Sequence, residues 1–109
     1  MPGMAWLAIA IVAEVIATTA LKASDGFRNT IPSVITATGY AIAFWGMSQA
    51  MRTLPVGIVY ALWSGVGIVL ITAIAWVLYR QQIDTAGLIG IGLILAGVVV
   101  IQVFSKATA

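Results

Sequence analysis

The sequence contains neither cysteine nor histidine, and charge is scarce: five Lys or Arg and three Asp or Glu among 109 residues. Without cysteine the chain can build neither a disulfide framework nor a thiolate metal site. Without histidine it lacks the usual proton shuttle of soluble enzymes. We therefore expect no enzymatic activity, no metal and no other cofactor. The basic residues form no patch with interleaved aromatics, which excludes nucleic acid as a partner.

Apolar residues, by contrast, make up 62% of the chain, too many for a soluble domain of this length to cover with polar groups. Four apolar stretches approach or exceed the roughly 20 helical residues that cross a lipid bilayer. They are Met4–Leu21, Pro32–Met51, Gly57–Tyr79 and Ala86–Phe104. The sequence predicts an all-α integral membrane protein with four transmembrane helices in one domain, residues 1–109.

Short polar segments separate the apolar stretches, at residues 22–28, 52–55 and 80–84. Pro32 and Pro55 stand at or before helix starts, where the missing N–H group has no partner in the helix anyway. Loops this short join antiparallel neighbours, so we expect one compact up-down bundle.

Glu14 is the one acid within an apolar stretch. It falls near the bilayer midplane, where an ionised group costs on the order of 2.5–3.5 kcal/mol and is functional by default. Its helical neighbours Ala10, Ala17 and Thr18 are small or weakly polar, which leaves room around the carboxyl group. Desolvation favours the protonated form, so we expect Glu14 to hold or release a proton at physiological pH.

A site that holds either a proton or an organic cation, but not both, must release one before it binds the other. It therefore couples the flux of protons across the membrane to a flux of cations in the opposite direction. The other two acids, Asp25 and Asp84, lie in loops with Arg28 and Arg80 nearby, and solvated surface charges are the better interpretation there. Glu14 is therefore the predicted proton-binding and substrate-binding residue.

Aromatic residues line one face of the third stretch, where Tyr60 and Trp63 are three residues apart and Ser64 follows. Tyr40 and Phe44 are four apart on the second stretch. Aromatic faces attract cations without supplying donors, although aromatics at this spacing also serve packing or lipid contact. The acid nearby favours a cation pocket, in which Ser64 and the hydroxyl group of Thr18 are the expected hydrogen-bonding groups.

Glycines mark two further features. Gly65 and Gly67 weaken the middle of the third helix and suggest a hinge for alternating access, with close packing an equally good explanation. Gly90 and Gly97 in the fourth stretch would let another helix approach closely, without indicating which helix.

The Lys and Arg residues that normally fix membrane orientation are almost balanced. One side collects Lys22, Arg28 and Arg80, and the other collects Arg52 and Lys106. A small exporter with few charges explains this balance; so does an antiparallel homodimer, in which two copies create an inverted repeat.

Several segments together resemble the small multidrug resistance family of bacterial exporters, over essentially the whole chain. They are Ala13-Glu14-Val15, Leu21-Lys22-x-Ser24-x-Gly26-Phe27, Pro32-Ser33, Pro55-x-Gly57-x-x-Tyr60-Ala61-x-Trp63-Ser64-Gly65-x-Gly67, and Gly90 through Val98.

The resemblance implies a proton-coupled antiporter that works as an antiparallel homodimer in the bacterial inner membrane. It places the essential glutamate on Glu14 and the aromatic substrate positions on Tyr40, Tyr60 and Trp63. It also implies a kink at Gly65 and Gly67 and a dimer motif from Gly90 to Val98. The segment Trp63–Ile71 resembles the branch that exports aromatic and quaternary ammonium cations.

Three alternatives remain open. The family also includes exporters of guanidinium-type ions. Outside it, a proton-translocating subunit of a rotary machine also uses one carboxylate in a small apolar chain, but typically has two spans. An accessory membrane subunit without transport of its own is the third.

Overall fold

The computed structural model describes residues 2–104, and all the regular secondary structure in that range is helical. Its four helices are α1 (Gly3–Ala23), α2 (Thr30–Ala50), α3 (Val56–Tyr79) and α4 (Thr85–Phe104). They coincide with the four apolar stretches, and their ends differ from the predicted ones by at most two residues. Pro32 lies in the first turn of α2 and Pro55 caps α3, both positions where proline is tolerated.

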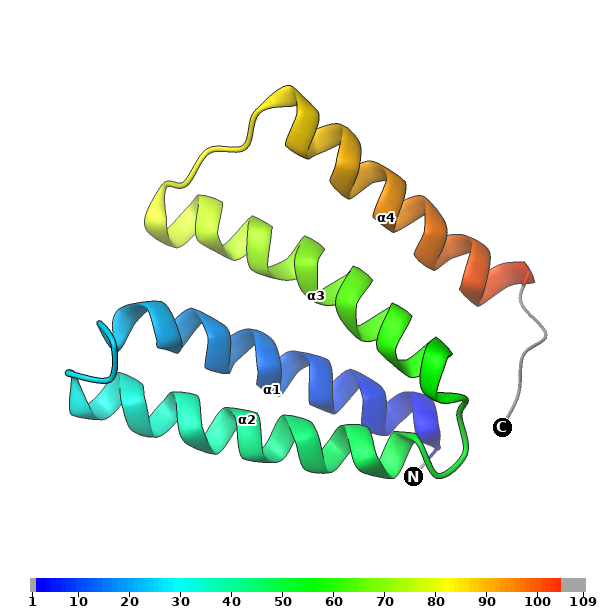
Figure 1. Ribbon diagram of the computed structural model, residues 1–109, viewed down its shortest axis with the longest axis horizontal. Coiled ribbons are helices and arrows are strands. Elements are labelled where there is room, and N and C mark those ends of the chain that lie inside the picture. The colour runs from blue at the N-terminus through cyan, green and yellow to red at the C-terminus, as the bar shows by residue number, and fades with distance from the viewer. Residues whose placement is uncertain (1, 105–109) are drawn as a thin grey trace.

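The helices lie side by side in the order α2, α1, α3, α4 (Figure 1). The chain measures 44 × 35 × 16 Å, so its shortest dimension is little more than one helix diameter of about 10–12 Å. The expectation of a compact bundle is therefore wrong for the single chain. Short loops fix antiparallel neighbours, but they do not force the row of helices to close.

The contact between α1 and α2 is the most extensive, because small side chains let the two helices approach closely. Ala10, Ala17 and Ala43 are fully buried there. A methyl group added to Gly39 would come within 2.8 Å of the Cβ atom of Ala17, and one added to Gly46 within 3.2 Å of the Cβ atom of Ala10. This is the small-residue packing typical of membrane helices.

The larger core side chains lie mainly between α1 and α3. Leu7, Ile11 and Val15 of α1 form one buried cluster with Val59 and Leu62 of α3. Their spacing of three or four residues puts each set on one helix face. The acid at position 14 belongs to the same helix, so its backbone is held by packing on two sides.

Helix α4 packs mainly on α3, and none of residues 85–104 is buried. A methyl group added at Gly65 of α3 would overlap Val98 and lie 3.3 Å from Ile94, so Gly65 permits this contact. On Gly90 and Gly97, an added methyl group would meet nothing within 4 Å in the described chain. The predicted dimer positions thus lie on an open surface.

Within the described residues, three helices are long and apolar enough to cross a membrane: α1, α3 and α4. Helix α2 is as long as α1, since each has 21 residues. It carries more hydroxyl and amide side chains than α1. Those groups include Thr36, which donates to the backbone oxygens of Pro32 and, at 3.3 Å, Ala17. Some of the polarity of α2 is therefore used within the protein.

Candidate functional site around Glu14

Glu14 lies near the middle of α1, 11 residues after Gly3 and nine before Ala23. At a rise of about 1.5 Å per residue, it is more than 13 Å of helix from the nearer end. Its side chain is half-buried. Of the three acids in the sequence, it is the one that lies within a helix. The site is therefore built around a single carboxyl group.

A chain of two hydrogen bonds connects Glu14 to α2. The hydroxyl group of Thr18, one turn later on α1, donates to Oε1 of Glu14 at 2.7 Å. The hydroxyl oxygen of Tyr40 lies 2.7 Å from the same Thr18 oxygen. Because Thr18 has only one hydroxyl proton, which goes to Glu14, Tyr40 is the donor in the second bond. This arrangement stabilises the ionised carboxylate.

The other carboxylate oxygen faces α3. A methyl group added to the buried Gly67 would lie 3.5 Å from Oε2 of Glu14 and 3.9 Å from Cδ1 of Trp63. Glycine at this position therefore leaves a space about the size of a methyl group between the carboxylate and an indole ring. The sequence motif contains this residue, but only the structure shows that it faces the acid.

Three aromatic rings form a row beside this space. The ring centroids of Tyr40 and Phe44 are 6.0 Å apart, those of Phe44 and Trp63 are 6.1 Å apart, and both pairs are inclined by 21°. Phe44 is 57% exposed. Tyr40 thus contributes to both features, with its hydroxyl group in the hydrogen-bond chain and its ring in the aromatic row.

The structure does not bring every predicted site residue into this cluster. Tyr60 is 66% exposed, and its ring is not part of the aromatic row. Ser64 is half-buried on α3, next to Trp63. The roles predicted for Tyr60 and Ser64 in substrate binding stay predictions. Trp45, to which the sequence assigned no role, packs edge-on against Trp6 with centroids 4.9 Å apart.

Gly65 and Gly67 face different neighbours although they are two residues apart, because two residues turn a helix by about 200°. Gly65 faces Val98 of α4, and Gly67 faces Glu14 of α1. Helix α3 runs as one continuous element past both. Close approach explains both glycines here, and the hinge stays a prediction.

The two loop acids have local partners. Asp25 lies 3.8 Å from Arg28 in an exposed pair, and Asp84 accepts a hydrogen bond of 2.9 Å from the backbone N–H group of Gly87. The second contact caps the start of α4. Neither acid takes part in the cluster at Glu14.

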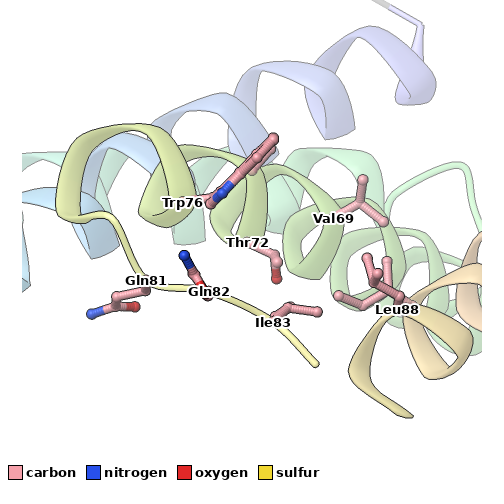
Figure 2. A pocket seen from close by; sticks show the side chains of 9 residues that line it. Val69, Thr72, Trp76, Gln81, Gln82, Ile83 and Leu88 are labelled. Atoms are coloured by element: carbon pink, nitrogen blue, oxygen red, sulfur yellow. The ribbon is translucent and has the colours of Figure 1, made fainter. Parts of the chain in front are cut away.

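The broadest cavities lie away from Glu14. One of about 520 Å³ opens between α3, residues 81–83 and the start of α4, and its lining includes the side chains of Thr72, Trp76 and Gln82 (Figure 2). Its α3 residues lie on the α4 side of that helix, opposite Gly67. Within residues 2–104, acids also form no cluster that could hold a metal ion.

Fold and site together define a class: a small helical membrane protein with one acid at mid-helix, hydrogen-bonded on one side and bordered by aromatic rings. The family model described as Small Multidrug Resistance protein matches residues 3–94. The chain therefore belongs to the small multidrug resistance family, whose members are embedded in membranes.

Individual relatives cover nearly the whole chain. It is 53% identical to the quaternary ammonium compound-resistance protein QacE of Escherichia coli over 109 residues, 100% of this chain and 99% of that protein. A multidrug transporter of Pseudomonas aeruginosa is 56% identical over 94% of both chains. The spermidine export protein MdtI of Shigella flexneri is 42% identical over 90% of both chains.

Proposed function

We propose that this protein exports hydrophobic and quaternary ammonium cations from bacteria in exchange for protons, with both competing for Glu14. The observation that carries the proposal is the position of Glu14 in mid-helix, with a hydrogen bond on one carboxylate oxygen and Gly67, beside aromatic rings, at the other. The names of the two most similar relatives reported above support the same class of substrate.

The ionised and protonated forms of Glu14 have different partners in this scheme. The ionised form receives the Thr18 hydrogen bond and attracts a cation into the space beside Gly67. Phe44 and Trp63 offer ring faces, worth about 0.5–2 kcal/mol each to a desolvated cation. A proton arriving at the carboxylate removes the charge that holds the cation. Loading one therefore requires release of the other.

The proposal includes an antiparallel homodimer in the inner membrane, in which α2 also spans the bilayer. At 21 residues α2 is about 31 Å long, and it runs antiparallel along α1. Support for two copies comes from the open row of helices, the open surface at Gly90 and Gly97, and the balanced basic residues. Lys106, counted in that balance, lies outside the described residues.

Uptake into liposomes tests the function. Purified protein should take up tetraphenylphosphonium against its gradient when the lumen is acidic. Glu14→Gln should abolish uptake, because the amide can neither ionise nor exchange a proton. Asp25→Asn is the matched control: it makes the same chemical change in an exposed loop and should transport like wild type. Uptake retained in Glu14→Gln would refute the proposal.

The orientation of the chain in the membrane can be tested separately by cysteine labelling, because the sequence contains no native cysteine. A single cysteine replacing the exposed Asn29 should react with a membrane-impermeant maleimide from both sides of the inner membrane, about half of the molecules from each. Labelling from one side only would rule out the antiparallel arrangement.

Export of a polyamine is the second candidate, because the relative from Shigella flexneri is named for spermidine export. A polyamine carries several separated positive charges, whereas each chain offers one acid in its helices. A single delocalised charge matches this site better. In a competition assay, we expect benzalkonium to displace bound tetraphenylphosphonium. Equal concentrations of spermidine or guanidinium should leave it bound.

A further inference from the structure

We infer that protons reach Glu14 by a route of their own, through a small cavity between α1 and α3 that ends at Thr18, while cations occupy the aromatic side between α2 and α3. This inference rests on the proposed exchange at Glu14. It adds residues of α3 and of the end of α1 that the exchange scheme does not itself require.

The route follows a polar stripe on α1. Glu14, Thr18 and Lys22 are spaced by four residues and therefore lie on one helix face. Glu14 is in mid-helix, Thr18 donates to it, and Lys22 is exposed in the last turn. The stripe thus leads from the membrane surface to the half-buried acid.

A cavity of about 130 Å³ lies along this stripe. Thr18, Thr19 and Lys22 line it from α1, and residues 71, 74, 75 and 79 line it from α3, with Gln81 beyond. At about 30 Å³ for each water in the liquid, it has room for roughly four water molecules. The hydroxyl, amide and ammonium groups of its lining can form hydrogen bonds that orient a chain of water molecules.

Tyr79 lines the outer part of the cavity. Its hydroxyl group donates a hydrogen bond of 2.8 Å to the backbone oxygen of Thr19, and the Nζ atom of Lys22 lies 5.6 Å from the centre of its ring. A side chain held by one hydrogen bond can close or open the path as α3 moves relative to α1. An exchanger needs such a closure, since a permanently open path would leak protons.

Proton transfer at the inner end needs only groups already in contact. A hydronium ion in the cavity gives a proton to the Thr18 oxygen as the Thr18 hydroxyl proton moves to Oε1 of Glu14. The products are water, an intact Thr18 and a neutral Glu14. Among the described residues, the other titratable groups on this path are Tyr40, which faces Thr18 from α2, and Lys22 and Tyr79 at the outlet.

The test separates arrival of protons from arrival of the cation. Protein in detergent is loaded with tetraphenylphosphonium at high pH and mixed rapidly with acid, and tryptophan fluorescence follows release. Ala75→Phe should fill the cavity and slow acid-triggered release by about tenfold, while association at constant high pH keeps its wild-type rate. The matched control is Ala73→Phe, the same change on a face of α3 outside this cavity.

Tyr79→Phe provides a test of opposite sign. The ring over Lys22 is retained but the hydrogen bond to Thr19 is lost, so acid-triggered release should become faster than in wild type. Release unchanged in both Ala75→Phe and Tyr79→Phe would overturn the separate route. Equal slowing of association and release in Ala75→Phe would overturn it too, because it would mean one shared path. If wild type and Glu14→Gln bind the cation equally, the proposed function itself has failed.

Discussion

Replacing Thr18 by valine should raise the pH at which the cation begins to bind. Valine keeps the shape of threonine but lacks the hydroxyl group that donates to Oε1 of Glu14 at 2.7 Å. A hydrogen bond to a charged group contributes about 1.5–3 kcal/mol. If that contribution is lost, cation affinity measured at the wild-type midpoint should fall by roughly ten- to a hundredfold.

The midpoint should rise because the ionised form of Glu14 is the form that loses its hydrogen-bond partner. The Thr18 hydroxyl group donates to the ionised carboxylate, so its removal disfavours ionisation and the proton stays bound to higher pH. The cation needs the ionised form and therefore binds only at higher pH. Well above the new midpoint, affinity for tetraphenylphosphonium should approach that of wild type, because the aromatic row is untouched.

The assay is equilibrium binding of tetraphenylphosphonium, measured by calorimetry over a series of pH values. Thr19→Val is the matched control, since that hydroxyl group donates to the backbone oxygen of Val15 and does not contact Glu14. The control should keep the wild-type midpoint. A midpoint equally unchanged in Thr18→Val would refute the reasoning that this hydroxyl group stabilises the ionised acid.

Three further substitutions test the surroundings of the site. Gly67→Ala should fold normally, since its methyl group would make ordinary contact at 3.5 Å from Glu14, yet lower cation affinity by about tenfold by occupying the binding space. Gly65→Ala should lower the free energy of unfolding in detergent by about 1–3 kcal/mol, because its methyl group overlaps Val98. Adding Val98→Ala should restore the free energy of unfolding. Phe44→Leu keeps an apolar side chain but removes the central ring, and calorimetry should show weaker binding by about 0.5–2 kcal/mol.

The number of helices and the mid-helix position of Glu14 could be predicted from sequence, because long uncharged stretches and an isolated acid within one of them are strong signals. The order of the helices in space could not. Lipid is as apolar as a protein core, so a membrane helix such as α4 has no polar face that would show which side meets α3. The open row was therefore missed, and a compact bundle was predicted instead.

The site was predictable only in part. Spacing suggested an aromatic wall of Tyr60 and Trp63 that Tyr40 and Phe44 extend. The structure places the rings of Tyr40, Phe44 and Trp63 in a row and leaves Tyr60 outside it. The hydrogen bond from Tyr40 to Thr18 depends on the register between α1 and α2, which no spacing within one helix reveals. Gly39 and Gly46, which are spaced by seven residues on α2, were the available signal for this close contact.

The most direct test of the central claim is the count of protons released when the cation binds. Tetraphenylphosphonium is added to purified protein in weakly buffered detergent solution near the binding midpoint, and a pH indicator records the change. We predict net proton release in wild type that disappears in Glu14→Gln. Cation binding to wild type without proton release at any pH across the binding transition would contradict competition at Glu14.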